Sequence, residues 1–172
     1  MYYTKTRLVK SPQRGTNKSA GIDFFVPEFT DEFLSDLQKK SNVEIEGDNI
    51  ILNPHSSVLI PAGIKVNLEK TRVDFLHTWN GIYLNAHNKS GIASKHGLIK
   101  GAETVDEDYQ GELHINVINT TDEIRYIREN SKLIQFILEE TNYITPIEIE
   151  TETELFTSEP ERGVGGFGST EN

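Results

Sequence analysis

Residues 58–68 read VLIPAGIKVNL, which places two short apolar runs on either side of the turn tripeptide Pro61-Ala62-Gly63. Short apolar runs that are rich in β-branched residues and separated by proline and glycine are typical of β-strands joined by a turn. This stretch therefore predicts a β-hairpin and indicates a fold rich in strands.

Two later stretches extend the β pattern. Residues 112–117 (ELHINV) alternate polar and apolar side chains, which predicts a strand with one face in water. Residues 133–138 (LIQFIL) are apolar on both faces apart from Gln135, so we expect a central strand there. A buried glutamine needs hydrogen-bond partners, which makes Gln135 a candidate for a binding site.

Helical signals are few. Thr30 can cap a helix that has acidic residues in its first turn and two lysines, Lys39 and Lys40, in its last. A second, short helix is expected after Ser90, with a glycine stop at Gly97. Many short strands with little helix predict an all-β fold, namely a jelly-roll-like β-barrel with one short surface helix.

A chain of 172 residues is long enough for one domain with a substantial core. We expect the barrel to occupy residues 1–160, and we expect residues 29–53, which hold the first helix, to form a surface insertion that could bind a partner. Residues 161–172 would then form a glycine-rich C-terminal arm. The glutamates and the proline that precede it favour an extended connector, so we expect the arm to be mobile without ligand and ordered with it.

Composition restricts the function classes. Seventeen basic against twenty-seven acidic residues give a net charge of -10, which disfavours binding to polymeric nucleic acid and to anionic membranes. Cysteine is absent and the five histidines lack metal-ligand spacing, so Mg²⁺ held by oxygen atoms is the metal to consider. No apolar run suits a membrane span or a signal peptide, so we expect a cytoplasmic protein, in a cell or in the host of a virus.

Residues 161–171 read ERGVGGFGSTE and combine groups that suit a nucleoside phosphate. Glycine frees backbone N–H groups to wrap phosphate oxygens, and Arg162 can grip those oxygens bidentately. Ser169 and Thr170 add hydroxyl donors, while Phe167 can stack on a base. The specific interpretation is a phosphate-binding arm, and the alternative is an ordinary disordered tail.

Four further polar or glycine-rich clusters interrupt the apolar strands before the arm. They are residues 20–24 (AGIDF), 88–93 (NKSGIA), 105–112 (VDEDYQGE) and 130–135 (NSKLIQ). Each alone can be an ordinary loop, but their order resembles the deoxyuridine triphosphatase (dUTPase) family. The motifs of that family run A-G-x-D, P-R-S-G-x-A, G-x-I-D-x-D-Y-x-G, G-D-R-x-A-Q and R-G-x-G-G-F-G-S-T. The resemblance therefore spans residues 20–170.

The resemblance implies a jelly-roll enzyme that hydrolyses dUTP to dUMP and pyrophosphate with Mg²⁺. It also implies a homotrimer whose active sites are shared between subunits and closed by the arm of a third. At the matching positions, Asp106 would deprotonate a water aimed at the α-phosphorus, and Gln135 would bond the α-phosphate or that water. Tyr109 would stack under the deoxyribose and fill the space that a 2′-hydroxyl needs. Asp23 would act through metal-bound waters.

The remaining residues that the resemblance implies contact the base and the phosphates. Ser90 and the Gly91 amide, at a helix N-terminus, suit phosphate oxygens, and Phe167 would cover the uracil. The complete predicted substrate-binding set is Lys89, Ser90, Gly91, Tyr109, Lys132, Arg162, Gly166, Phe167, Gly168, Ser169 and Thr170.

The sequence also departs from the family pattern. Lys89 and Lys132 stand where the family usually has arginine, which exchanges a planar fork for a point charge. Asn88 replaces proline, and residues 130–131 replace Gly-Asp, which affects loop geometry more than chemistry. Glu103 stands where the family has glycine, beside the hairpin whose backbone reads uracil, so base selectivity could differ.

Three alternatives remain. A dCTP deaminase or bifunctional enzyme of the same fold needs a glutamate at the position of Asn116 and lacks the Phe-Gly-Ser-Thr arm. A nucleotide-binding regulatory protein on this scaffold would keep the contacts and lose turnover, whereas Asp106 and Tyr109 are both present. A structural jelly-roll module would require every polar cluster to be a coincidence.

Overall fold

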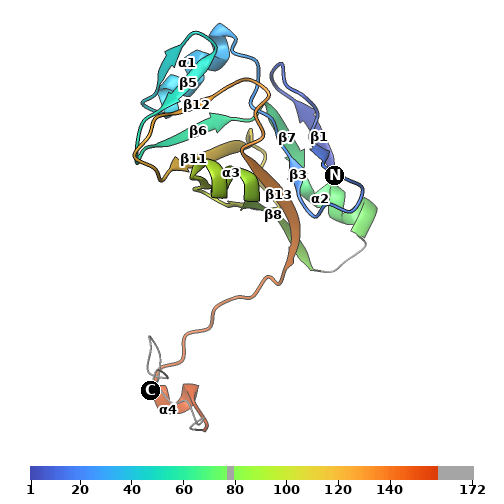
Figure 1. Cartoon of the computed structure of the whole chain (residues 1–172). Coiled ribbons are helices and arrows are strands. Elements are labelled where there is room, and N and C mark those ends of the chain that lie inside the picture. The colour runs from blue at the N-terminus through green and yellow to red at the C-terminus, as the bar shows by residue number, and fades with distance from the viewer. Residues whose placement is uncertain (77–79, 159–172) are drawn as a thin grey trace. The chain divides into compact units, whose positions relative to one another are not determined.

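The computed structural model describes residues 1–76 and 80–158 and is built mainly of short β-strands (Figure 1). The chain divides into two compact units, Met1–Asn142 and a second unit that begins at Tyr143. The first unit ends earlier than the predicted boundary at residue 160, because its last strand stops at Thr141. In the described part of the second unit, residues 152–155 form one helical turn, α4 (Glu152–Leu155).

Strands alternate with a few short helices along the first unit. In chain order the elements are β1 (Tyr2–Lys5), β2 (Gln13–Arg14), β3 (Ile22–Asp23), α1 (Asp31–Lys40), β4 (Glu44–Glu46), β5 (Asn49–Leu52), β6 (Ser57–Pro61), β7 (Ile64–Asn67), α2 (Leu68–Thr71), the π-helical η1 (Arg72–Leu76), β8 (Gly81–Asn88), α3 (Ser90–His96), β9 (Leu98–Lys100), β10 (Thr104–Val105), β11 (His114–Asn119), β12 (Arg125–Ile127) and β13 (Ile134–Thr141).

The strand pairs of the described residues are antiparallel and form four small sheets. The largest runs β10-β8-β13-β3-β2, and the others are β6-β11-β9, β12-β5-β4 and β1-β7. Their apolar side chains meet in one core, where the rings of Phe24 and Phe136 pack edge to face at 4.9 Å. This arrangement confirms the predicted all-β, jelly-roll-like fold.

The predicted hairpin at residues 58–68 is wrong in its pairing, although both strands form. β6 pairs with β11 and β7 pairs with β1, so the two strands lie in different sheets. Leu113 separates them, since its carbonyl accepts the Ala62 N–H at 2.8 Å and its own N–H donates to the Ile64 carbonyl at 2.8 Å. Gly63 makes the crossing with a φ of 68°, which glycine adopts without strain. Turn residues mark the end of a strand, but segments distant in sequence decide its partner.

The predicted strands at residues 112–117 and 133–138 both form, and the second is central as expected. β13 lies between β8 and β3, and its first residues alternate between the core and the opposite face of the sheet. β11 lies between β6 and β9, with Ile115 buried and His114 and Asn116 half-buried. Because neighbouring side chains on a strand point to opposite faces, Gln135 and Phe136 face away from each other.

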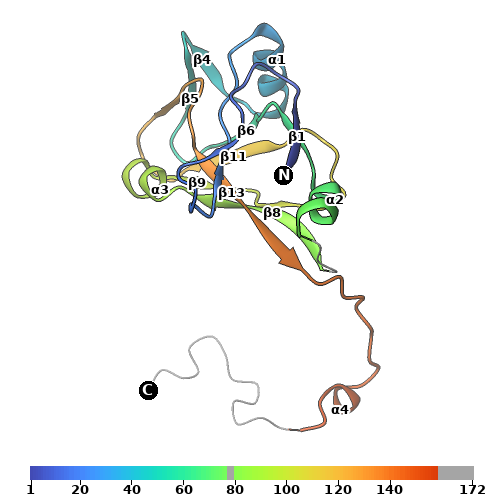
Figure 2. The same ribbon diagram turned by 90° about the vertical axis from the view of Figure 1, so that its right-hand side faces the viewer.

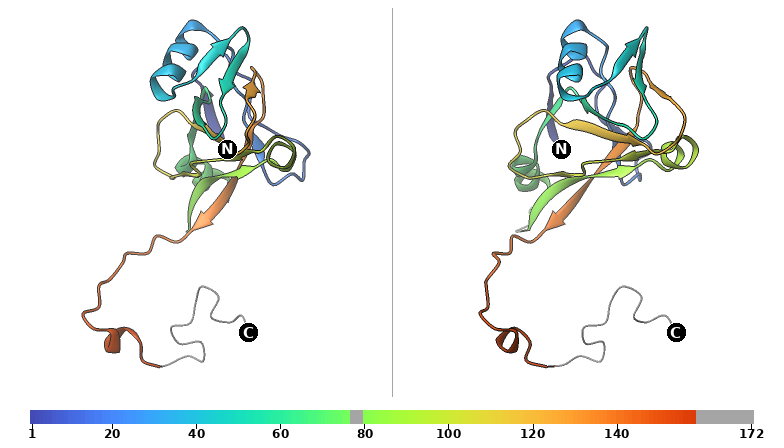
Figure 3. Two further views of the ribbon diagram at one scale, coloured as in Figure 1. Left: turned by 60° about the vertical axis from the view of Figure 1, so that its left-hand side comes forward. Right: turned by 90° about the vertical axis from the view of Figure 1, so that its left-hand side faces the viewer.

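Helix α1 begins as predicted, with the Thr30 hydroxyl accepting the Phe33 N–H at 3.2 Å. Phe33 and Leu37 are fully buried, as is Leu52 of β5. The segment 29–53 is therefore part of the core and is not a surface addition, because the apolar face of α1 packs on β6. Together α1, β4 and β5 form one end of the first unit (Figures 2 and 3).

Two left-handed residues end local elements. α3 stops at Gly97 as predicted, where a φ of 62° lets the Gly97 N–H donate to the Ala93 carbonyl. Asn130 has a φ of 61°, and asparagine tolerates this region better than most residues, so it can stand at the place of the motif glycine.

Among the helices in residues 1–76 and 80–158, none has the length and apolar character of a membrane span.

Candidate active site

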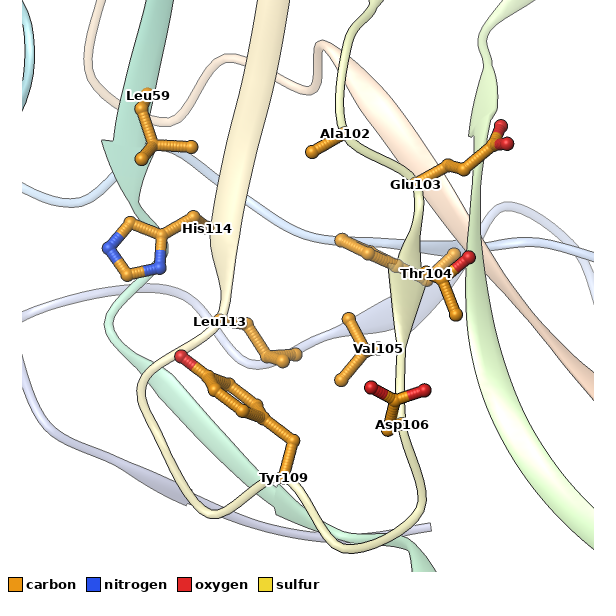
Figure 4. A pocket seen from close by; sticks show the side chains of 10 residues that line it. Leu59, Ala102, Glu103, Thr104, Val105, Asp106, Tyr109, Leu113 and His114 are labelled. Carbon is orange, nitrogen blue, oxygen red and sulfur yellow. The ribbon is translucent and has the colours of Figure 1, made fainter.

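A pocket lies between the loop of residues 101–113 and the adjoining ends of β6 and β11 (Figure 4). We call it the hairpin pocket. Its lining residues are Leu59, Ala102, Glu103, Thr104, Val105, Asp106, Tyr109, Leu113, His114 and Phe136. Apolar walls with a few polar groups suit a small ring system that carries few polar atoms.

Asn116 holds one side of the hairpin pocket in place. Its Oδ1 accepts the Ala102 N–H at 2.7 Å, and its Nδ2 donates to the Val58 carbonyl at 2.9 Å. Gly101 lies against the same amide, where an added Cβ would overlap Oδ1. The sequence pointed to Asn116 only as the place where a deaminase needs glutamate. Its position on the wet face of an alternating strand, next to the polar clusters, was the signal for this positioning role.

The loop after β10 carries Asp106, the predicted general base, and Tyr109, which is predicted to stack under the deoxyribose. Asp106 and Tyr109 both line the hairpin pocket, and the Tyr109 N–H donates to the Asp106 carbonyl at 3.2 Å. Glu107 braces the loop, since its carboxylate accepts the Arg72 Nε–H at 2.6 Å and the Ile82 N–H at 3.3 Å. Asp106 is exposed, so water has access to its carboxylate beside a fixed tyrosine.

The ring of Tyr109 is held by the end of the same loop. Its hydroxyl donates to the Glu112 carbonyl at 3.0 Å, and Figure 4 shows it directed toward the start of β11. Gly111 leaves room for the ring, because a Cβ at that position would overlap the Tyr109 hydroxyl. The glycine of the motif is therefore required by the position of the tyrosine ring.

A second pocket lies at the start of α3, and we call it the α3 pocket. It is lined by Lys89, Ser90, Gly91, Ile92, Lys95, His96 and Gln135. Three of the predicted phosphate-binding residues thus lie together with Gln135, as expected from the motifs. Lys95 adds a cation that the motifs did not indicate. Ammonium groups beside backbone N–H groups suit an anion such as phosphate.

Gln135 and Asp23 support the α3 pocket from the sheet. Gln135 donates from Nε2 to the Asn88 carbonyl at 3.2 Å, so the NH₂ group of its amide has a hydrogen-bond partner. Asp23 is buried, and its two oxygens pair with Lys89 at 2.5 Å and with Lys132 at 3.3 Å. A buried carboxylate needs such partners, and this one holds both lysines that replace motif arginines on the same side of the sheet.

The hairpin pocket and the α3 pocket lie on opposite sides of the five-stranded sheet. Gln135 lines the α3 pocket, whereas Phe136, the next residue of β13, lines the hairpin pocket. Asp23 is the register partner of Gln135 and shares its side. Since adjacent residues of a strand face opposite sides, the two pockets of one chain do not converge on one small ligand.

Comparison with known proteins identifies the kind of protein that carries these two pockets. The family model described as dUTPase matches residues 48–171, which is most of the chain. The chain belongs to the dUTPase family. The deoxyuridine 5'-triphosphate nucleotidohydrolase of Fusobacterium nucleatum subsp. nucleatum is 31% identical over 164 residues, covering 94% of this chain and 99% of that protein. The protein of the same name from Treponema denticola is 36% identical over 123 residues, covering 70% of this chain and 75% of that protein.

Solved dUTPase structures share the fold. A mutant of the dUTPase of Staphylococcus bacteriophage 80alpha, in a structure with dUpNHpp, aligns with a TM-score of 0.68 at 19% identity, and the alignment covers 98% of this chain and 96% of that chain. The EIAV dUTPase aligns with a TM-score of 0.58 at 18% identity, covering 87% and 96%. At these identities the likeness concerns the fold, and it agrees with the predicted jelly-roll architecture.

Glu103, which replaces a glycine of the dUTPase motif, leaves the hairpin pocket open. Its carboxylate pairs with Lys100, and Figure 4 shows it directed away from His114 and Tyr109. Its carbonyl accepts the Ala86 N–H at 2.8 Å, so the backbone stays part of the sheet. The departure therefore places a carboxylate on the outer side of the hairpin, away from His114 and Tyr109.

The fifth dUTPase motif falls outside the described residues. The predicted residues concerned are Arg162, Gly166, Phe167, Gly168, Ser169 and Thr170. Their contacts with nucleotide, and the ordering of the arm by ligand, stay predictions.

We expect Gly111→Ala to lower kcat/KM for dUTP by at least about tenfold, because the new Cβ displaces the Tyr109 ring and misplaces the sugar. Gly15→Ala is the matched control, since a Cβ at Gly15 would make an ordinary contact with Ser19 Oγ at 3.4 Å and Gly15 lines neither pocket. Steady-state kinetics on both variants check this. A Gly111→Ala enzyme with wild-type kcat/KM would show that the observed position of Tyr109 is not needed.

Proposed function

We propose that this chain is a dUTP diphosphatase, which hydrolyses dUTP to dUMP and pyrophosphate by attack of water on the α-phosphorus. The observation that carries the proposal is the braced loop that brings Asp106 and Tyr109 to one pocket. A solvent-accessible carboxylate beside a fixed aromatic ring suits a reaction at a phosphate attached to a sugar. The relatives described above are named for the same nucleotidohydrolase activity.

The hairpin pocket would receive the nucleoside. Leu59 and Val105 offer apolar contact to the pyrimidine, and backbone groups of the hairpin lie within its reach. The Tyr109 ring would pack against the deoxyribose and occupy the space that the 2′-hydroxyl of a ribonucleotide needs. Selection against UTP would then be steric, whereas selection of the base would depend on the hairpin backbone.

The α3 pocket would receive the phosphates. Lys89, Ser90 and Gly91 supply an ammonium, a hydroxyl and backbone N–H groups, and Gln135 supplies an amide. These local donors matter because the chain has a net charge of -10, which repels a triphosphate at long range. Asp106 would act as the general base toward water, and the charge that develops on the phosphates would be taken up by the cations.

Magnesium is the cofactor that the proposed reaction requires. Within residues 1–76 and 80–158, no three His, Asp or Glu side chains cluster as a ready-made metal site. This fits an ion carried mainly by the triphosphate, because Mg²⁺ keeps several waters and needs only one or two carboxylates beside substrate phosphates. Asp23, next to Lys89, is the proposed carboxylate, and it would bind the ion through water as the lysines turn to phosphate. When bound, the ion neutralises charge on the triphosphate.

The positions of the two pockets support an active site that is shared between subunits. They face opposite sides of one sheet, so a nucleotide that fills both needs the hairpin pocket of one subunit and the α3 pocket of another. A homotrimer with three such shared sites, each closed by a C-terminal arm, satisfies this requirement by symmetry.

The structure offers little support for deamination. A deaminase needs a carboxylate on the strand after the tyrosine loop, where this chain has Asn116. The Asn116 amide is engaged on both sides, with the Ala102 N–H and the Val58 carbonyl. It therefore serves the backbone of the hairpin and is not available to transfer protons at a base.

Pyrophosphate release from dUTP, dCTP, dTTP and UTP, measured in parallel with Mg²⁺ and with excess chelator, tests the proposed function. We expect kcat/KM for dUTP to exceed that for each other nucleotide by more than tenfold, equivalent to about 1.4 kcal/mol of transition-state binding. We expect the chelator to abolish turnover, because without Mg²⁺ the negative charge of the triphosphate is not neutralised and the acidic protein repels it. Cleavage of dTTP or UTP within tenfold of dUTP, full activity in chelator, or dUMP formed from dCTP would each contradict the proposal.

A further inference from the structure

Helix α1 reaches the hairpin pocket by two separate contacts. Lys40, at the end of the helix, donates from Nζ to Nε2 of His114 at 2.8 Å, and His114 lines the pocket. Asp36, one turn earlier on the same face of α1, accepts from Nη2 of Arg7 at 2.7 Å. Arg7 in turn binds Glu112, which lies at the end of the tyrosine loop. The helix thus contacts His114 directly and Glu112 through Arg7.

Glu112 is the junction between α1 and the tyrosine. Its carboxylate accepts from Arg7 at 2.7 Å and 3.0 Å and from the Gly63 N–H at 2.7 Å. Its carbonyl accepts the Tyr109 hydroxyl at 3.0 Å. The side chains of Arg7 and Glu112 are only 12% and 16% exposed, so solvent screens the pair weakly. A shift of Glu112 would therefore move the anchor of the Tyr109 ring.

The charge state of this junction is well defined. Burial alone would raise the pKa of the Glu112 carboxyl, but the hydrogen bonds from Arg7 and the Gly63 N–H outweigh it and hold that pKa below its usual value. Burial, followed by the charge of Lys40, lowers the pKa of His114, and Arg7 acts in the same direction while Glu112 opposes it. A lysine has only donors to offer, so Nε2 of a neutral His114 accepts and its proton resides on Nδ1.

We propose that α1 is the positioning element of the hairpin pocket, with Asp36 and Lys40 as positioning residues. Asp36 acts through Arg7 on Glu112, Lys40 acts on His114, and together they hold Tyr109 where it excludes a 2′-hydroxyl. The proposal rests on the proposed function, because it concerns the sugar selectivity of that same site. It also gives a role to the segment 29–53, whose apolar side joins the core while Asp36 and Lys40 reach Arg7 and His114.

The test compares a variant that cuts both contacts with one that leaves them. Asp36→Ala combined with Lys40→Met removes both links and retains the Arg7–Glu112 pair. Lys39→Met is the matched control, because Lys39 lies on the same helix but is 70% exposed, and its only ion pair among the described residues is with Asp36, at 3.3 Å. The full chain is used throughout, with kcat and KM measured separately for dUTP and UTP, and the melting temperature of each variant is recorded.

We expect the double variant to lose at least about tenfold in its preference for dUTP over UTP, because a loosened tyrosine no longer blocks the 2′-hydroxyl. Lys39→Met should keep the wild-type preference, and Lys40→Arg should keep most of it, since arginine restores a cation and a donor. An unchanged dUTP/UTP ratio in a folded double variant would overturn the role of α1. If the double variant fails to fold, Lys40→Met alone decides, by the same ratio. A wild-type enzyme inactive on dUTP would instead reject the proposed function.

The pH profile gives a second measurement that a merely structural role would not move. Neutral His114 is the form that accepts a hydrogen bond from Lys40. This hydrogen bond is therefore lost as the pH falls through the pKa of His114. Lys40→Met lacks this hydrogen bond at every pH, so the acid-side loss of kcat/KM that belongs to His114 in the wild type should be absent from the variant. An acid limb at the same pH in wild type and Lys40→Met would contradict the link between Lys40 and His114.

Discussion

We expect Asp106→Asn to lower kcat for dUTP hydrolysis by at least about 100-fold while leaving nucleotide binding largely intact. Asparagine keeps the size of the side chain but does not accept a proton from water. The substituted group remains on a loop that Glu107 braces against Arg72 and Ile82, so the pocket keeps its shape. Single-turnover rates with dUTP, together with equilibrium binding of a non-hydrolysable analogue, separate the two effects.

Asp108→Asn is the control for this prediction. Asp108 is an exposed carboxylate of the same loop and is absent from the lining of the hairpin pocket. Its substitution changes the net charge by the same amount, so it should leave kcat near the wild-type value. Near-normal turnover in Asp106→Asn, or an equal loss in Asp108→Asn, would remove Asp106 from the role of the base.

We expect removal of the residues after Pro160 to leave the first unit folded and to lower kcat/KM for dUTP by at least about 100-fold. The core side chains of the described residues all lie within Met1–Asn142, so the truncation should change the melting temperature little. The motif residues that are lost include an arginine, an aromatic ring and two hydroxyls suited to the phosphates and the base. Thermal unfolding and steady-state kinetics on the truncated chain measure both effects.

Mixing the truncated chain with the Asp106→Asn chain tests whether the arm serves a neighbouring subunit. Each chain alone should be nearly inactive, whereas a hybrid trimer would contain sites with an intact Asp106 and an intact arm. We therefore expect part of the activity to return after subunit exchange. If exchange is demonstrated by mass or by fluorescence and no activity returns, the arm closes over its own subunit or the assembly is not a shared trimer.

Much of the active site could be predicted from the sequence, because its residues occur in short motifs whose chemistry is local. Lys89, Ser90, Gly91 and Gln135 were predicted from separate motifs and lie together in the α3 pocket. Asp106 and Tyr109 come from one motif and line the hairpin pocket. A motif also holds residues that leave room for one another, as Gly111 does for the Tyr109 ring.

Other features could not be predicted, because they depend on contacts between segments distant in sequence. The strands on either side of Pro61-Ala62-Gly63 were recognised, but their assignment to different sheets depends on Leu113. The burial of α1 in the core depends on β6, although its cap at Thr30 is local and was predicted. The positioning role of Asn116 depends in the same way on Ala102 and Val58.

The sequence by itself determined that the chain is a strand-rich member of the dUTPase family and which short motifs carry its chemistry. Helix caps, the alternation of polar and apolar residues, turn residues and motif spacing are properties of neighbouring residues, so they can be recognised from the sequence alone. Only the tertiary structure decided that the two pockets lie on opposite sides of β13, and that α1 reaches the tyrosine loop through Arg7, Glu112 and His114. Strand partners and ion pairs between remote residues are selected by the packing of the whole core, which no single stretch of sequence specifies.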